Sequence, residues 1–243
     1  MSNEVAGREH WTHKGEVRLF LWEKFVGAPD GKPAVLFVHG SSMASQPTFD
    51  LAVPDRPDSS VMDWFARRGF VCWTVDMEGY GRSDKTRDAF VWTGEGAPTL
   101  EQRRKKLPEF LATKRRPIDR AFVRSIFARD HPDCAEPRVV EAFADAILAL
   151  DDSMPNGTYI DMCSKLPVVD PAKIIVPTLV LRGQYDGIAA MDDLVEFWKR
   201  LPNPDKQFTV MAGISHASFQ QKNYVMVYHI LHAYFTQPVP VYA

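Results

Sequence analysis

This chain of 243 residues has few cysteines, no long apolar run and no large excess of one charge. Its three cysteines form no CxxC pair and show no Cys/His metal spacing, which favours a reducing, cytoplasmic setting over a disulfide framework or a zinc site. No apolar stretch approaches the ~20 residues of a membrane span, and the first ten residues have no apolar core of a signal peptide. The formal net charge of −2 gives no reason to expect nucleic acid or an anionic membrane as a partner.

The first part of the chain alternates strand and helix patterns. Residues 16–24 alternate apolar and charged side chains, which predicts an edge strand with one wet face. Ala34–Val38 is a continuous apolar run and predicts a central parallel strand covered on both faces. Residues 59–68 have apolar side chains at helical spacing with Gly69 as a C-cap, and residues 70–75 predict the next strand. This alternation predicts an α/β fold with right-handed crossovers.

The middle of the chain has a different pattern. Between residues 93 and 165 apolar side chains recur at helical spacing and prolines separate the runs, which predicts an all-helical insertion. Strand and helix patterns then resume, with strands at 178–181 and 207–211, a helix near 191–201 and a long C-terminal helix to about Phe235. The patterns divide the chain into an N-terminal part of the core (1–92), a helical cap (93–165) and a C-terminal part of the core (166–243).

Four short motifs follow the predicted strands in order. The first strand runs into His39-Gly40, and the second into Asp76-x-x-Gly79-x-Gly81-x-Ser83-Asp84. The third ends in Gly183-Gln-Tyr-Asp186, and the last is followed by Gly213-Ile-Ser215-His216. In this order and spacing the chain resembles α/β-hydrolases with a helical cap. The resemblance implies a mostly parallel sheet with helices on both faces, a small-molecule substrate, and neither a metal nor an organic cofactor.

The resemblance also assigns roles. In such enzymes an acid after a late strand orients a histidine, which activates a nucleophile on a tight strand–helix turn. By position the acid is Asp186 and the base is His216, while the backbone N–H of Ser41, next to Gly40, would help to stabilise the oxyanion. Trp92 and the cap helices would line a pocket for an ester, thioester, amide or related bond of a small, partly apolar molecule. The residues alone also allow Asp186 to be a turn aspartate that satisfies local amides, and the glycine turn to be only a tight turn.

The nucleophile is the part that the sequence does not supply. The pattern G-x-S-x-G does not occur, and its relaxed form at Gly213-Ile-Ser215-His216-Ala217 makes Ser215 only a weak candidate, because adjacent residues on a sharp turn point in different directions. Only residues 85–90 separate Asp84 from the strand-like Val91-Trp92, whereas a strand, two helices and their connections need ~50 residues. We therefore expect a central strand region to be missing, so that its neighbours expose their edges. Two functions stay open: a hydrolase, and a catalytically inactive deletion variant or binding derivative of the same family.

Overall fold

A computed structural model describes residues 4–85, 105–128, 131–164 and 169–238. The chain forms two compact units, one of residues 1–120 and 142–168 and one of residues 121–141 and 169–243. The strands are β1 (Val5–Lys14), β2 (Val17–Val26), β3 (Ala34–Val38), β4 (Val71–Val75), β5 (Arg115–Pro117), β6 (Ser153–Pro155), β7 (Thr178–Gly183) and β8 (Lys206–Met211). The α-helices are α1 (Ser45–Phe49), α2 (Val61–Ala66), α4 (Leu107–Ala112), α5 (Arg120–Ala128), α6 (Pro137–Leu148), α7 (Gly157–Ser164), α8 (Met191–Arg200) and α9 (Tyr224–Thr236). Short 3₁₀ helices are η2 (Pro132–Cys134), η3 (Pro171–Lys173) and η4 (Ser218–Gln220).

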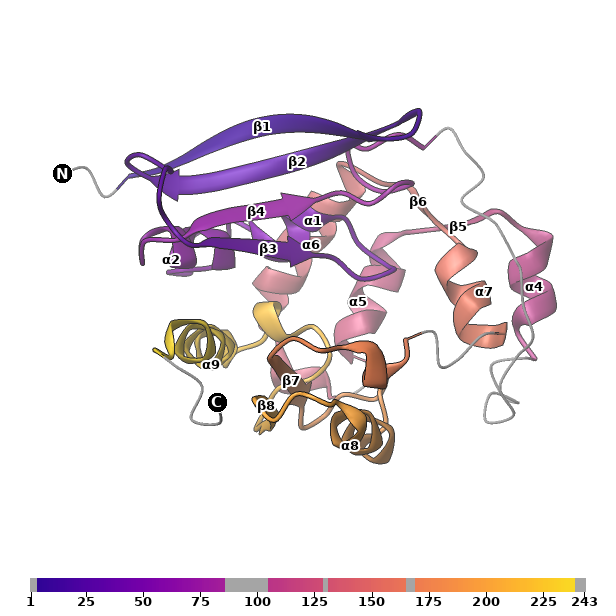
Figure 1. Ribbon diagram of the computed structural model, residues 1–243. Helices are drawn as coiled ribbons and strands as arrows, with labels where there is room; N and C mark the ends of the chain where they lie inside the picture. Colours follow the sequence, from indigo (N-terminus) through magenta and orange to yellow (C-terminus); the bar gives the residue numbers. More distant parts are fainter. Residues whose placement is uncertain (1–3, 86–104, 129–130, 165–168, 239–243) are drawn as a thin grey trace. The chain divides into compact units, whose positions relative to one another are not determined.

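The first unit contains a four-stranded sheet in the order β1-β2-β4-β3 (Figure 1). β1 pairs antiparallel with β2 along its whole length, from Val5 opposite Val26 to Lys14 opposite Val17. β2 is also antiparallel to β4, and β3 is parallel to β4. The prediction of an edge strand at residues 16–24 is therefore wrong, because β1, which the sequence analysis did not identify, covers that edge.

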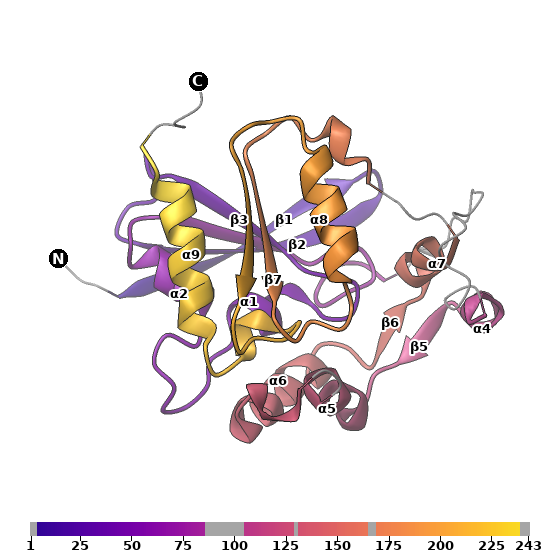
Figure 2. The ribbon, with the colours of Figure 1, turned by 90° about the horizontal axis from the view of Figure 1, so that it is seen from below.

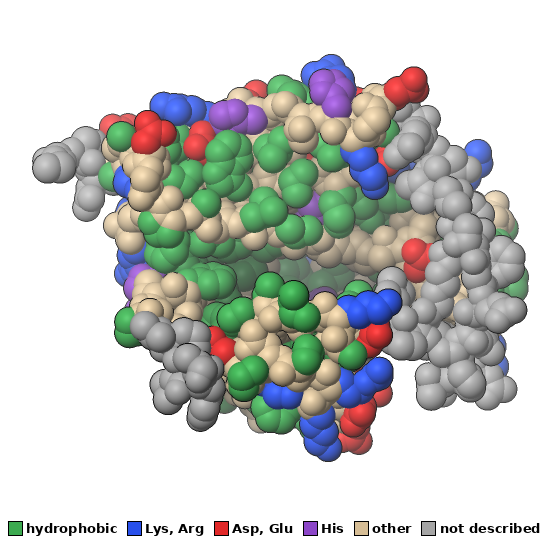
Figure 3. All heavy atoms as spheres, in the orientation of Figure 1, with side chains coloured by type: hydrophobic (Ala, Val, Ile, Leu, Met, Phe, Trp, Pro, Cys, Tyr) green, Lys and Arg blue, Asp and Glu red, His purple; other side chains and the backbone are tan. Residues whose placement is uncertain are grey.

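β3 is an edge strand with one bare face. Among the described strands it pairs with β4 alone. Val35 and Phe37 are buried, but Leu36 and Val38 are 59% and 55% exposed, and hydrophobic side chains gather over this sheet in Figure 3. The prediction of a central strand covered on both faces is wrong.

Aromatic side chains between α1, α2 and the sheet form the core of the first unit. The Phe37 ring lies 5.2 Å from Phe49 and 6.0 Å from Phe65, centroid to centroid. Helix α2 begins where the Ser60 hydroxyl accepts a hydrogen bond from the backbone N–H of Asp63 at 3.0 Å. Gly69, with a φ of +91°, follows the helix in the left-handed conformation, as the C-cap prediction requires.

The segment expected to be all-helical also contains a short antiparallel ribbon, β5 with β6. That expectation is wrong in this respect, although α4 to α7 are helical as predicted. The ribbon contacts the glycine-rich loop after β4, because Arg115 Nη2 donates to the carbonyl of Gly79 at 3.0 Å. The carboxylate of Asp151 accepts from the backbone N–H of Gly81 at 2.9 Å and pairs with Lys85 at 2.7 Å.

The second unit contains the parallel pair β7–β8, with α8 alongside it (Figure 2). The predicted strands and helices of this region are confirmed within one or two residues. Met211, at the end of β8, is 2% exposed, and Ile214 and Tyr228 are fully buried. β7 and β3 belong to separate sheets. No helix in the described ranges is long and apolar enough to cross a membrane.

Candidate active site

Asp186 and His216 meet at one end of the β7–β8 pair. Asp186 lies in the turn after β7 and His216 in the loop after β8. Gly183 is opposite Met211 in the parallel register, so the two strands end at the same edge and the following turns lie close together. The structure places His216 Nδ1 3.1 Å from Asp186 Oδ2, which brings together the two residues that the motif order singled out.

The hydrogen bond fixes the tautomer of the imidazole. An ionised carboxylate only accepts hydrogen bonds, so the proton lies on His216 Nδ1 and Nε2 carries a lone pair in the neutral ring. Nε2 has no hydrogen-bond partner among residues 4–85, 105–128, 131–164 and 169–238. The His216 side chain is 46% exposed, whereas that of Asp186 is 11% exposed. The ring can therefore accept a proton from a molecule that arrives from solvent.

The surroundings of Asp186 favour its ionised form. Burial alone raises the pKa of this carboxyl group, but the hydrogen bond to His216 and the backbone N–H groups of Ile188 and Ala189 outweigh it, so the pKa is lowered overall. The bond from Ile188 N to Asp186 Oδ1 is 2.8 Å long. Asp186 is therefore also a turn aspartate that satisfies a local amide, as the alternative interpretation of the sequence allowed. One carboxylate oxygen serves the turn, however, and the other holds the imidazole.

Backbone bonds connect the two turns. The N–H of Tyr185 donates to the carbonyl of Ile214, and that of Gln184 to Met211, both at 2.9 Å. In return Gly213 N–H donates to the Gln184 side-chain oxygen at 3.0 Å. These bonds limit how far the Asp186 turn can move from the His216 loop.

Ser215 is not placed as a nucleophile. Its side chain is fully buried, and its hydroxyl has no hydrogen-bond partner in the described part of the chain. A serine nucleophile must be within hydrogen-bond reach of its base and of the substrate. Its weakness as a candidate, which the sequence analysis drew from its position next to His216, therefore has a second cause in its burial.

The glycine turn after β3 belongs to the first unit. His39 is buried, its Nδ1–H donates to the Gly40 carbonyl at 2.7 Å and its Nε2 accepts from Met77 N–H at 2.9 Å. Burial lowers the pKa of His39, which keeps this ring neutral. The Tyr80 hydroxyl donates to the Ser41 carbonyl at 2.6 Å. His39 and Tyr80 thus fix the turn in place.

The N–H groups of this turn are available to a ligand. Those of Gly40 and Ser41 donate to no group among the described residues, as an oxyanion hole requires. A Cβ at Gly40 would meet no described atom within 4 Å, so packing among the described residues does not itself require glycine at this position. Trp92, predicted to line the pocket, lies outside the described residues.

The glycine-rich loop after β4 has a structural role that the sequence did not specify. The buried carboxylate of Asp76 accepts from Ser45 N–H at 2.8 Å, from the Ser45 hydroxyl at 2.6 Å and from Arg82 N–H at 3.0 Å. At Gly81, with a φ of +51°, a Cβ would lie 2.2 Å from Asp76 Oδ2. The motif is thus required for packing around Asp76.

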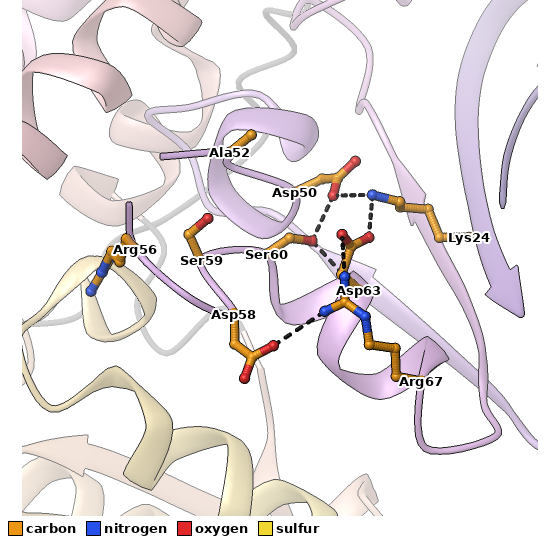
Figure 4. A pocket seen from close by; sticks show the side chains of 9 residues that line it. All are labelled: Lys24, Asp50, Ala52, Arg56, Asp58, Ser59, Ser60, Asp63 and Arg67. Carbon is orange, nitrogen blue, oxygen red and sulfur yellow. Dashed lines mark hydrogen bonds and ion pairs between the residues drawn. The ribbon is translucent and has the colours of Figure 1, made fainter. Parts of the chain in front are cut away.

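A polar hollow of about 280 Å³ lies elsewhere in the first unit (Figure 4). Lys24 Nζ contacts the carboxylates of both Asp50, at 2.7 Å, and Asp63. Burial lowers the pKa of Lys24, but the two carboxylates outweigh it and the pKa is raised overall. The Ser60 hydroxyl donates to Asp50 at 2.6 Å. These groups satisfy one another, and none of the predicted site residues lines the hollow. Within the described ranges, no cluster of His, Cys, Asp and Glu could hold a metal ion.

The chain is similar in structure to several solved α/β-hydrolases. A soluble variant of monoglyceride lipase from Saccharomyces cerevisiae matches with a TM-score of 0.64 and 13% identity over 94% of this chain and 95% of that one. E-2-(acetamidomethylene)succinate hydrolase matches with a TM-score of 0.60 and 14% identity over 96% and 100%. The thioesterase domain from the curacin biosynthetic pathway matches with a TM-score of 0.57 and 12% identity over 94% and 99%. No protein-family model and no curated protein sequence matches the chain. The α/β-hydrolase fold is thereby confirmed.

Proposed function

We propose that the chain is a hydrolase that cleaves an ester, thioester, amide or related bond of a small, partly apolar molecule. The observation that carries this proposal is the 3.1 Å contact between Asp186 and His216 at the ends of two parallel strands. An acid and a histidine at these positions form the general-base pair of the fold. The names of similar structures, which include a lipase and a thioesterase, support an acyl-transfer reaction.

In the proposed reaction His216 Nε2 removes the proton of the attacking hydroxyl, thiol or water. The nucleophile adds to the substrate carbonyl and an oxyanion forms, for which the resemblance to α/β-hydrolases assigns the N–H of Ser41, next to Gly40, as a donor. His216 then returns the proton to the leaving alcohol, thiol or amine as the carbonyl reforms. Where the nucleophile is water this completes hydrolysis; where it is a side chain, water then attacks the acyl-enzyme with His216 as the base, and the acid leaves as the proton returns to the side chain. Asp186 holds the imidazole in the required tautomer and stabilises its charged form. The proposal uses no metal and no organic cofactor.

The protein as a whole is proposed to act in a reducing compartment such as the cytoplasm, because Cys72, Cys134 and Cys163 are all buried and free. We assign residues 93–165 to a helical cap, and we expect Trp92 and the cap helices to line the substrate pocket.

A second function is favoured by a specific observation. Among the described residues, no serine, threonine or cysteine side chain is hydrogen-bonded to His216 Nε2. The bare edge of β3 also fits a sheet from which the nucleophile-bearing strand has been lost. The alternative is therefore a catalytically inactive derivative that retains the acid–base pair, either a deletion variant or a binding protein.

Hydrolysis assays and active-site labelling distinguish the two functions. Purified protein is incubated with p-nitrophenyl butyrate, with a short acyl thioester and with an anilide, and separately with a fluorophosphonate followed by peptide mapping. The proposed hydrolase releases product faster than a sample of the same protein denatured by heat. Release at the rate of the denatured sample for all three substrates, from a protein with a cooperative unfolding transition, supports the inactive derivative. A labelled serine would identify the nucleophile, whereas hydrolysis without a label indicates that His216 activates water.

A further inference from the structure

The side chain of Arg182, in β7, donates hydrogen bonds to several backbone carbonyls of the turn that contains Asp186. Its Nη1 donates to the carbonyls of Gly183 at 2.8 Å and Gln184 at 3.2 Å. Its Nη2 donates to the carbonyl of Asp186 at 2.8 Å, and its Nε to that of Ala189 at 3.3 Å. One guanidinium therefore bonds four backbone carbonyls between residues 183 and 189.

These four hydrogen bonds depend on the planar guanidinium group, whose N–H donors have fixed directions. Arg182 forms no ion pair with a described carboxylate, and the Asp186 carboxylate is bonded instead to His216 and Ile188. The positive charge attracts the carbonyl oxygens, so that the turn closes around the guanidinium. Lysine is a compact ammonium on a flexible stem and lacks a rigid fork that could reach carbonyls on both sides of the turn.

We propose that Arg182 is a positioning residue for the acid of the site. By fixing the carbonyls on both sides of Asp186, it holds the carboxylate where Oδ2 meets His216 Nδ1 and Oδ1 meets Ile188 N–H. Arg182 touches neither of these atoms and acts only through the turn. The inference rests on the proposed function, in which the Asp186–His216 pair is the acid–base pair of the reaction.

The test is the tautomer of His216, read from the ¹⁵N chemical shifts of its ring nitrogens by NMR. The variants are Arg182→Lys, Asp186→Asn as the reference that removes the carboxylate, and Arg200→Lys as a matched control. Arg200 is an exposed arginine on α8, 3.6 Å from Asp170. We expect the ratio of Nδ1–H to Nε2–H tautomer to fall about tenfold in Asp186→Asn and Arg182→Lys, as the loss of a hydrogen bond to a charged group implies, and to stay unchanged in Arg200→Lys.

The outcomes separate this inference from the proposed function. If Asp186→Asn lowers the ratio and Arg182→Lys does not, the positioning role is wrong and the pair stands. If Asp186→Asn leaves the ratio unchanged, the pair itself is wrong. If Arg182 only stabilises the fold, Arg182→Lys lowers the thermal midpoint of unfolding but leaves the His216 tautomer ratio unchanged. Should that variant not fold, Arg182→Gln, which keeps two N–H donors, replaces it and is expected to give an intermediate ratio, and a wild-type ratio there would overturn the inference.

Discussion

The His216→Ala variant is expected to hydrolyse p-nitrophenyl butyrate about 10²–10⁴-fold less efficiently than the wild type, which is the usual contribution of a general base. The substitution removes the nitrogen that accepts the proton of the nucleophile. Because the imidazole donates a hydrogen bond to the largely buried Asp186 carboxylate, we expect the free energy of unfolding to fall by about 1–3 kcal/mol. The measurement is kcat/KM together with urea unfolding of the same samples.

A second histidine provides the control for this prediction. His13 is exposed on β1, so His13→Ala removes an imidazole without touching the pair. We expect its kcat/KM to equal that of the wild type. Wild-type hydrolysis by His216→Ala would show that another group is the base, and the mechanism proposed above would be wrong.

The Gly183→Ala variant is expected to lose stability and the Asp186–His216 contact together. A Cβ at this position would lie 2.5 Å from the carbonyl oxygen of Ile214 and 2.6 Å from that of Ser215. These are backbone atoms, so the loop before His216 must move away from β7 to make room. Overpacking of this kind costs about 1–3 kcal/mol of unfolding free energy, measurable by urea unfolding.

The matched substitution is Gly40→Ala. A Cβ there would meet no described atom within 4 Å, and the residue has no positive φ. We expect its unfolding free energy to stay within about 0.5 kcal/mol of the wild type. Equal stabilities for the two variants would mean that the loop before His216 does not pack against the end of β7, and a retained His216 tautomer in Gly183→Ala would mean that this packing does not position the pair.

The strands that build the pair could be predicted because their signals are local. β7 contains the apolar run Leu179–Leu181 and β8 alternates polar and apolar residues, and their bounds differ from the predicted 178–181 and 207–211 by two residues at most. The contact of Asp186 with His216 followed from one general rule, that parallel neighbouring strands end at the same edge of a sheet. The helix at 191–201 followed from its apolar spacing in the same way.

The elements that the sequence did not predict depend on non-local pairing. β1 is largely exposed and includes Gly7, Arg8 and Glu9, so its own residues show little strand preference, and it forms because all ten residues pair with β2. β5 and β6 are only three residues each and contain prolines. The exposure of β3 depends on which segments of the chain lie beside it. The apolar run of β3 does not show which segments these are.

The residues that support the site also could not be predicted from the sequence. Arg182 comes directly after the apolar residues of β7, and nothing in the sequence indicates that its side chain donates to four backbone carbonyls. Asp151 and Arg115 contact the glycine-rich loop from positions 36 to 70 residues away along the chain. Such contacts depend on tertiary structure, and no spacing rule within a motif reports them.

The central claim is that Asp186 and His216 act as one unit in hydrolysis, and a double-mutant cycle on kcat/KM tests it most directly. The cycle compares the wild type, Asp186→Asn, His216→Ala and the double variant on p-nitrophenyl butyrate. If the carboxylate acts only through the imidazole, the double variant is no less active than His216→Ala alone, so the two losses are strongly non-additive. Losses that multiply, or an Asp186→Asn variant as active as the wild type, would contradict the account.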